Sequence, residues 1–289
     1  MLFEKGEYGM KKEKRVIVAL DFPGFSGALV ELISALAPYA MFKIGLELMT
    51  AEGAPNAVKF VTGHGGEVFF DGKFKDIEET IRKASRVVTE LRVKMFNVHI
   101  FGTSIKALVA AKEASAKKAN ELGIPEPLVL GVTILTDIDY QGLVEMGLMY
   151  KISMNEVFRA DNYAEAIQKI KEGKMQDLVG RLAVRAKSAG FDGVIASAQE
   201  APIIRDLCGS EFKIVAPAIR PVWAAKNEQK RITTPGDAIK ASADYLVVGR
   251  PITQPPPEIG GSLEAFRLIN KEAEGALAAM ENFPSLRNA

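Results

Sequence analysis

The stretch EVFFDGKFKDIEETIRKASRVVTELR, residues 67–92, joins a short apolar run to a longer amphipathic one. The run EVFFD at 67–71 is almost continuously apolar, which is typical of a strand covered on both faces in a parallel sheet. Residues 75–92 have the amphipathic pattern of a helix. The stretch therefore predicts a strand followed by a helix. Four charged residues lie at the junction: Asp71, Lys73, Lys75 and Asp76.

The same strand-then-helix unit recurs along the chain. Eight short apolar runs are candidate strands, at residues 15–20, 41–45, 67–71, 95–100, 128–134, 192–197, 213–218 and 244–249. Amphipathic segments separate them, and one of these, 104–123, ends on a glycine that can cap a helix. Eight such units favour an α/β fold, a (β/α)8 TIM barrel, although an open parallel sheet is compatible with the same count.

The chain reads as a single domain. Its 289 residues suit one large α/β barrel, and no linker or low-complexity tract interrupts them. We expect residues 1–14 to form an N-terminal extension and residues 15–289 to form the barrel. The interval between the fifth and sixth strands is unusually long, which predicts an inserted helical segment at about 147–180.

Composition excludes several classes of protein. Apolar residues make up 48% of the chain, charged residues 25%, and the net charge is +1, which gives no reason to expect binding to nucleic acid or to a membrane. The charged N-terminal segment lacks the apolar core of a signal peptide, and no run of eighteen apolar residues occurs. The single cysteine, Cys208, excludes an internal disulfide and fits a cytoplasmic location.

In α/β barrels the chemistry lies at the carboxyl-terminal ends of the strands. Side chains two residues apart on an extended segment point the same way, so Asp71 and Lys73 can share one side of the third strand's exit. Lys43 on the neighbouring strand can extend this into a line of alternating charge. The candidate rim residues are Asp21, Lys43, Asp71, Lys73, Thr136, Pro217, Arg220, Gly249 and Arg250.

Alternating charges have a chemical use. Two carboxylates alone would repel, but interleaved ammonium groups keep both ionised and keep each lysine charged. Such a preorganised array stabilises negative charge that develops on an atom unable to stabilise it, and a lysine there can also deliver a proton. The rim therefore indicates catalysis through an anionic intermediate.

Several sequence blocks together resemble the orotidine 5'-phosphate decarboxylase family, from about Val16 to about Thr253. They occur in the family's order and approximate spacing: VIVALD, FKIGLEL, DGKFKDIEET, FNVHIFG, VTILTD, DGVIASAQEA, IRP, QKRITTP and DYLVVGRPIT. The resemblance implies decarboxylation of orotidine 5'-monophosphate to UMP and carbon dioxide in pyrimidine biosynthesis, without metal or organic cofactor.

The resemblance also implies roles for individual residues of the charged rim. Lys73 resembles the proton donor to C6 of the pyrimidine, and Asp71 the carboxylate placed against the substrate's own carboxylate. Lys43 and Asp76 would complete the array. The resemblance further implies a homodimer with shared sites, in which three residues reach across the interface to the partner's site: Asp76, Ile77 and Thr80.

Other positions resemble substrate contacts. Asp21 and Lys43 match contacts to the ribose hydroxyls, and Thr136 matches a contact to the pyrimidine. Four residues resemble a phosphate site: Arg220, Gln229, Gly249 and Arg250. The segment VVGRP gives this assignment an independent reason, because backbone amides and a guanidinium just beyond the eighth strand can hold a phosphate dianion. Residues 219–231 are a candidate lid over it.

Each candidate also has a plain structural explanation. An isolated DxKxxD pattern is most often a helix N-terminal turn with surface charges. Lys43 can reach solvent from a strand end, and Thr136 can cap the turn around Asp137. We expect His99 to be a hydrogen-bonded packing residue and Lys75 a solvated surface charge.

Two residues depart from the family's pattern. Gly72 replaces a bulkier apolar residue between Asp71 and Lys73, and we expect looser packing behind Lys73. Ala218 stands where the family commonly has glycine, so that turn must accept a β-carbon. Two rival functions remain open: a Mg²⁺-dependent aldolase of the hexulose-phosphate synthase type, and a phosphate-binding barrel without catalysis.

Overall fold

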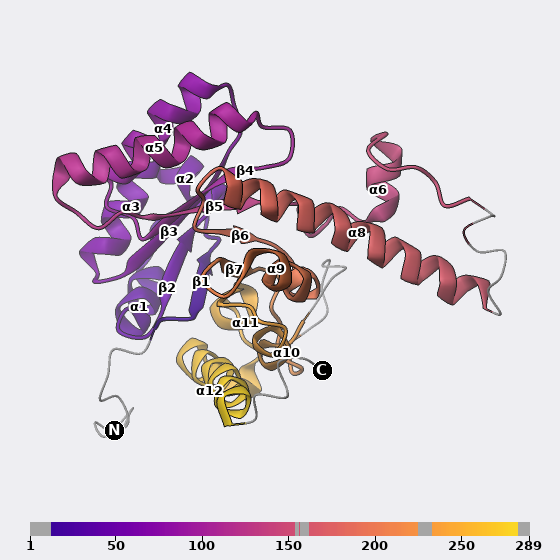
Figure 1. The fold of residues 1–289 in the computed structure, drawn as a ribbon. Coiled ribbons are helices and arrows are strands. Elements are labelled where there is room, and N and C mark those ends of the chain that lie inside the picture. Colours follow the sequence, from indigo (N-terminus) through magenta and orange to yellow (C-terminus); the bar gives the residue numbers. More distant parts are fainter. Residues whose placement is uncertain (1–12, 154–155, 157–161, 225–232, 283–289) are drawn as a thin grey trace.

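The protein is an eight-stranded α/β barrel. The computed structural model describes residues 13–153, 156, 162–224 and 233–282. Eight parallel strands close into a barrel in sequence order, and helices surround it (Figure 1). Because β8 pairs with β1, the predicted closed barrel is confirmed and the open sheet is excluded.

All eight predicted strands are present, most of them shorter by one to three residues than the apolar runs. One differs in the other direction, because β3 continues past Asp71 to Phe74. The strands are β1 Val16–Leu20, β2 Met41–Ile44, β3 Glu67–Phe74, β4 Met95–His99, β5 Leu128–Val132, β6 Gly193–Ile195, β7 Lys213–Ala216 and β8 Tyr245–Val248.

The helices begin and end where capping residues allow. Ser26 and Ser104 accept hydrogen bonds from backbone amides in the first turns of α1 and α5. Gly123 ends α5 with a φ of 59°, which confirms the predicted glycine cap. The described helices are α1 Gly27–Leu36, α2 Leu46–Glu52, α3 Ala54–Gly63, α4 Glu78–Glu90, α5 Ile105–Leu122, α6 Tyr140–Glu145, α8 Tyr163–Ser188, α9 Ala201–Cys208, α10 Pro235–Lys240, α11 Arg250–Thr253 and α12 Ser262–Asn282.

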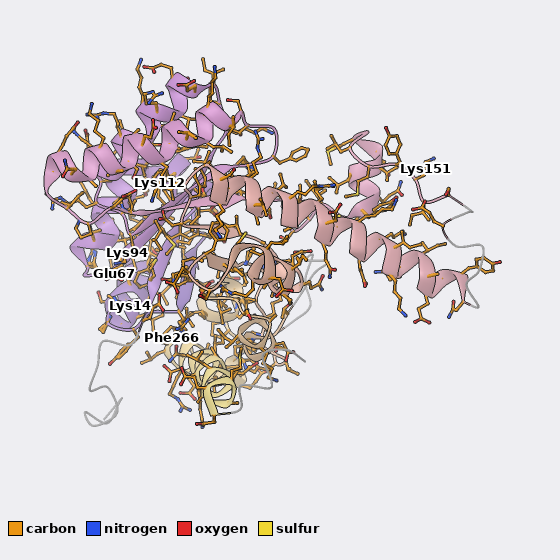
Figure 2. The ribbon with its side chains drawn as sticks, in the orientation of Figure 1. Lys14, Glu67, Lys94, Lys112, Lys151 and Phe266 are labelled. Atoms are coloured by element: carbon orange, nitrogen blue, oxygen red, sulfur yellow. The ribbon has the colours of Figure 1, made fainter. Side chains whose placement is uncertain are left out.

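The long interval between β5 and β6 contains α6 and the 26-residue helix α8. The carboxyl-terminal half of α8 packs on the barrel through buried residues such as Val179 and Ala183, whereas no residue of 163–174 is buried. This first half and α6 project from the barrel as an arm, with Lys151 at its far side (Figures 1 and 2). An ion pair of 2.9 Å between Lys174 of α8 and Glu156 connects this helix to the segment that lies between α6 and α8.

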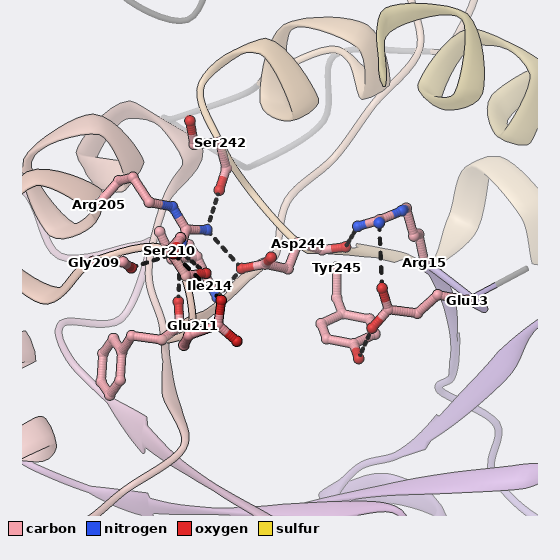
Figure 3. Close-up of polar contacts among 11 residues, drawn as sticks. Glu13, Arg15, Arg205, Gly209, Ser210, Glu211, Ile214, Ser242, Asp244 and Tyr245 are labelled. Carbon is pink, nitrogen blue, oxygen red and sulfur yellow. Dashed lines mark hydrogen bonds and ion pairs between the residues drawn. The ribbon is translucent and has the colours of Figure 1, made fainter. Parts of the chain in front are cut away.

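Polar contacts close the face of the barrel where the strands begin (Figure 3). Arg205 of α9 donates to the side chain of Asp244, which in turn accepts from the backbone N of Ile214 at 2.7 Å. The same guanidinium donates at 2.8 or 2.9 Å to four carbonyl oxygens, those of Gly209, Ser210, Phe212 and Ser242. One side chain therefore ties α9 to the starts of β7 and β8.

Replacing Arg205 with alanine should destabilise the fold. Hydrogen bonds to a charged group contribute about 1.5–3 kcal/mol each, and water can replace part of them at this half-buried position. We expect the free energy of unfolding, measured by urea denaturation, to fall by about 2–4 kcal/mol. The control is Arg181→Ala, which removes an exposed ion pair with Asp177 and should cost less than about 0.5 kcal/mol. Equal losses in the two variants would contradict the role of Arg205.

Candidate active site

A polar layer lies directly above the apolar filling of the barrel. The filling consists of nine buried residues: Ile17, Ala19, Met41, Phe69, Met95, Leu130, Val215, Tyr245 and Val247. Alternate residues of a strand point to the same side, so the residues two positions beyond four of these also face inward. Those residues are Asp21, Lys43, Asp71 and Asn97. The polar layer therefore follows from strand alternation on β1 to β4.

Three of these side chains and Lys73 form a continuous chain of ion pairs. The Lys43 ammonium lies 3.2 Å from Asp21 Oδ1 and 3.2 Å from Asp71 Oδ2. The Lys73 ammonium donates to both Asp71 oxygens at 2.8 Å. The Asp71 side chain is only 7% exposed, and it is held between two ammonium groups. The line of alternating charge expected from the sequence is present within one chain.

The charge state of Lys43 follows from two opposing effects. Burial is the largest single influence and lowers its pKa, because a buried ammonium loses hydration. The ion pairs with Asp71 and Asp21, and the hydrogen bonds to the same carboxylates, together outweigh burial and raise the pKa above the ordinary value. Lys43 is thus a buried but charged ammonium, and its explanation as a lysine extending to solvent is wrong.

Lys73 lies in a bulge of β3. Pairing between β3 and β4 is regular up to Phe70, is interrupted, and resumes at Phe74. Within this bulge Lys73 has a φ of +47°, a left-handed conformation that is uncommon for a residue with a β-carbon. Alternation alone places Lys73 on the same side as Asp71. The bulge changes the direction of the strand there, and the Lys73 ammonium lies within hydrogen-bond distance of both Asp71 oxygens.

Packing behind Lys73 differs from the sequence prediction. A β-carbon on Gly72 would lie 2.6 Å from Cε1 of Phe70 and 3.0 Å from Cε1 of Phe74. The two aromatic rings therefore fill the space that a larger residue at position 72 would occupy. The expectation of looser packing is wrong, because Phe70 compensates for the missing side chain.

Two residues of the site were missed by sequence analysis. Asn97 is fully buried and donates to Asp71 Oδ1 at 2.6 Å. Gly45 directly follows β2 beside the ion pairs, where a β-carbon would lie 2.9 Å from the Lys43 ammonium nitrogen and 3.3 Å from Asp21 Oδ1. The alternating pattern on the fourth strand was the available signal for Asn97, whereas no sequence signal distinguished Gly45 from a helix-flanking glycine.

Asp76, Ile77 and Thr80 lie at the start of α4, outside the chain of ion pairs. The Asp76 side chain is exposed and accepts from the backbone N of Ile77 at 2.7 Å. Among the described residues, no ion pair joins Asp76 to Lys43 or Lys73. The Ile77 side chain points to solvent and is 71% exposed. A surface hollow of ≈ 430 Å³ adjoins these residues, lined by Lys75, Asp76, Ile77, Glu78, Gly102 and Ser104.

The ends of β7 and β8 place the remaining candidates on the same rim. Gly249 lies beside Asp21, since a β-carbon on Gly249 would be 3.8 Å from Asp21 Oδ2. Arg250 follows it and is exposed, whereas Arg220 is buried. Pro217 lies at the end of β7. Gln229 and most of the candidate lid lie outside the described residues.

The turn before Arg220 is strained. Ala218 has a φ of +64°, where a residue with a β-carbon costs about 1–2 kcal/mol relative to an ordinary conformation. The expectation that this turn accepts a β-carbon is confirmed. Thr136, in the loop after β5, is half-buried, and the helix that follows is capped by Asp139 rather than by Thr136.

His99 and Lys75 lie near the ion pairs without joining them. His99 is half-buried, and burial, followed by the nearby charges of Lys75 and Lys73, lowers its pKa. The imidazole is therefore neutral near pH 7. Lys75 is exposed, as the sequence predicts.

The described part of the chain lacks two kinds of feature. No helix there is both long and apolar enough to span a membrane. Over the same ranges, no three side chains of the His, Cys, Asp or Glu type are grouped so that they could hold a metal ion.

Comparison with known proteins agrees with the architecture. A model of the "Orotidine 5'-phosphate decarboxylase / HUMPS family" matches residues 14–260. The orotidine 5'-phosphate decarboxylase of Syntrophomonas wolfei is 40% identical over 256 residues, which cover 88% of this chain and 97% of that protein. The enzyme of the same name from Moorella thermoacetica is 39% identical over 267 residues, covering 92% of this chain and 94% of that protein.

A solved structure shares the fold. The crystal structure of orotidine 5'-phosphate decarboxylase from Lactobacillus acidophilus matches with a TM-score of 0.69 and 26% identity, covering 90% of this chain and 99% of that one. The family model spans most of the chain, and the two relatives are about 40% identical over nearly their whole length. The chain therefore belongs to the orotidine 5'-phosphate decarboxylase / HUMPS family.

Proposed function

We propose that the protein decarboxylates orotidine 5'-monophosphate to UMP and carbon dioxide, a step of pyrimidine biosynthesis in the cytoplasm, without metal or organic cofactor. The observation that carries the proposal is the buried Asp71 carboxylate between the ammonium groups of Lys43 and Lys73. Family membership supports the same reaction, since the relatives compared above are named for it.

Lys73 has the chemistry that the reaction requires. Loss of carbon dioxide from C6 leaves an electron pair on a carbon with little conjugative stabilisation. A fixed ammonium placed there stabilises the developing anion and can then transfer a proton to it. The positive φ at residue 73 and the two hydrogen bonds to Asp71 restrict where the ammonium can lie.

Asp71 has two roles in this proposal. It holds Lys73 in one position, because both of its oxygens accept from that ammonium. It also lies against the carboxylate of the bound substrate. Repulsion between the two carboxylates is relieved as carbon dioxide leaves, so the site favours the transition state over the bound substrate.

A second chain completes the site in a homodimer. Asp76, Ile77 and Thr80 are assigned to the partner's site, and their exposure at the start of α4 leaves them accessible to a second chain. The adjoining hollow of ≈ 430 Å³ offers a complementary surface for a partner. Asp76 then supplies a second carboxylate to the partner's ion pairs.

The phosphate of the substrate is assigned to Arg220, Gln229, Gly249 and Arg250. The position of Gly249 beside Asp21 supports this, because it sets the phosphate contacts next to the proposed ribose contacts of Asp21 and Lys43. Thr136 and Pro217, on the same rim, are assigned to the pyrimidine side. Binding energy from the phosphate can stabilise a closed site that lowers the barrier for the distant reaction.

The rival functions fit the site less well. A Mg²⁺-dependent aldolase needs carboxylate oxygens free to bind the ion. Here both Asp71 oxygens already accept hydrogen bonds from an ammonium group, and one of them also accepts from Asn97. A barrel that only binds phosphate has no use for the buried Asp71 carboxylate, because a carboxylate repels an anion.

The proposal is tested by following the ultraviolet absorbance of orotidine 5'-monophosphate in the presence of EDTA. We expect loss of the substrate's absorbance and formation of UMP at a rate unaffected by the chelator, because charged side chains stabilise the intermediate. Turnover of orotidine 5'-monophosphate that EDTA abolishes would contradict the mechanism without metal, and an aldolase activity on a sugar phosphate that EDTA abolishes would support the rival function. No turnover with or without metal would refute the proposal.

Matched lysine variants serve as controls in that assay. Lys73→Ala should lose nearly all turnover while still binding UMP, because the ribose and phosphate contacts are intact. Lys169→Ala removes an exposed lysine on the projecting half of α8, remote from the ion pairs, and should stay within about threefold of the wild type. Near-normal turnover in Lys73→Ala would overturn the role assigned to it.

The phosphate contacts predict a selective loss of substrate binding. Gln229→Ala and Arg250→Ala each remove hydrogen bonds to a dianion, so we expect kcat/KM for orotidine 5'-monophosphate to fall by about 10- to 100-fold. The slow reaction of orotidine, which lacks the phosphate, should change by less than about threefold. Equal losses with both substrates would contradict the assignment, and Arg181→Ala is the control for removal of a surface arginine.

A further inference from the structure

Asn97 occupies an unusual place for a neutral amide. It lies in the middle of β4, points into the barrel beside the ion pairs, and is 0% exposed. A buried amide is stable only when its donor and acceptor groups both find partners. Asn97 finds both on β3, one on the side chain of Asp71 and one on the backbone of Lys73.

The backbone contact repairs an interruption of the sheet. Strands β3 and β4 pair at Phe70 with Phe96 and next at Phe74 with Val98, so the three β3 residues 71–73 face Asn97 alone. The regular ladder of backbone hydrogen bonds cannot continue across such a bulge. The Lys73 N–H donates instead to Asn97 Oδ1 at 2.7 Å. This bond anchors the backbone at the residue whose φ is +47°.

The side-chain contact orients the carboxylate. Asn97 Nδ2 donates to Asp71 Oδ1 at 2.6 Å. Since a backbone N–H can only donate and a carboxylate can only accept, one orientation of the amide satisfies both partners. An ionised aspartate at position 97 would present acceptor oxygens to both the Lys73 N–H and the Asp71 carboxylate. A leucine would offer neither a donor nor an acceptor.

We infer that Asn97 is a positioning residue for the proposed decarboxylation: its amide fixes Asp71 and the backbone of Lys73 relative to each other, and so aims the Lys73 ammonium. The inference rests on the proposed function. It differs from a packing role, because packing requires only the volume of the side chain, whereas positioning requires a donor and an acceptor at defined places.

Two variants with the same branching and number of side-chain heavy atoms as asparagine separate these roles. Asn97→Leu removes both hydrogen bonds and adds some volume at a buried position, so its effect is read together with that of the second variant. Asn97→Asp keeps the shape but sets a second carboxylate against Asp71, and two carboxylates so close favour uptake of a proton. Once protonated, the new acid has a hydroxyl to donate to Asp71 and a carbonyl to accept from Lys73, which restores the pattern of the amide.

Other charges face this position, so the pH dependence must be read as a difference from the wild type. They are Asp71, Lys73 and Lys75 from β3 and its following loop, Lys43 from β2, Asp21 from the end of β1, and His99 from β4 itself. The ammonium groups favour the ionised form of the new carboxyl and oppose its protonation. All of these groups are common to the wild type and the variant, so only the added carboxyl changes the ratio of their activities.

The test measures kcat and KM for orotidine 5'-monophosphate from pH 5 to pH 8. We expect Asn97→Leu to lower kcat by about 100-fold at every pH, with KM changed by less than about threefold, because a misplaced reacting group affects the chemical step most. We expect the kcat of Asn97→Asp relative to wild type to rise by about tenfold or more as the pH falls from 8 to 5. Val129→Ala, a buried position on β5 facing the helices, is the control for destabilisation and should leave both profiles unchanged.

Two results would overturn the inference. One is a kcat within about threefold of the wild type in folded Asn97→Leu. The other is an Asn97→Asp variant whose loss is the same at every pH, which would indicate a role in packing alone. If neither variant folds, hydrogen exchange on the wild type decides: the Lys73 amide should be protected as strongly as its strand neighbours, and rapid exchange would contradict the bond to Asn97.

The contact between Asn97 and Asp71 can also be tested without decarboxylase activity, which distinguishes a failure of this inference from a failure of the proposed function. If the wild type does not act on orotidine 5'-monophosphate, the urea unfolding midpoints of wild type and Asn97→Asp can still be compared. The shared proton has a higher pKa in the folded variant than in its unfolded chain, so its stabilisation is lost as the pH rises. The variant should therefore approach the wild type's midpoint as the pH falls from 8 to 5. A difference that is independent of pH would contradict the contact with Asp71.

Discussion

The site depends on one buried carboxylate. Asp71 is held between the ammonium groups of Lys43 and Lys73, at 3.2 Å and 2.8 Å, with an amide hydrogen bond from Asn97. An isolated charge at this depth would be unstable, and each charge of the group has neighbours that carry the opposite sign or donate to it. The group is thus stable only as a whole, which places a charged lysine at the mouth of an otherwise apolar barrel.

The barrel supplies the conditions for this arrangement. Strand alternation brings polar side chains inward only above the apolar filling, where the strands end. Lys73, in a bulge of β3, lies within hydrogen-bond distance of Asp71, while Gly45 leaves room for the Lys43 ammonium. The opposite face carries the Arg205 contacts that join α9, β7 and β8. These stabilising contacts and the proposed chemistry therefore lie at opposite ends of the barrel.

Sequence reasoning found the features that depend on local pattern. The apolar runs gave all eight strands, and the charges at their ends gave Asp21, Lys43, Asp71 and Lys73. It missed Asn97, because the role of this residue depends on how β3 pairs with β4. That pairing register cannot be read from the sequence of either strand alone. It misjudged Gly72, because the ring that fills its space belongs to Phe70. Strand and helix patterns predict which residues are buried in the core, but not how exposed segments are arranged. They therefore did not predict that the first half of α8 projects from the barrel, or that Asp76 and Ile77 lie away from the ion pairs.

The central claim is that Asp71 and Asp21 keep the buried Lys43 ammonium charged, and the titration of Lys43 tests it most directly. Its ammonium can be followed by NMR in lysine-labelled protein, with Lys43→Met giving the assignment. We expect a pKa above the ordinary 10.5, because Asp71 and Asp21 outweigh burial. The stabilisation from these ion pairs is then complete below pH 10.5 and is lost as the pH rises through the folded-state pKa. A pKa below 10.5 would show that burial prevails and would contradict the account.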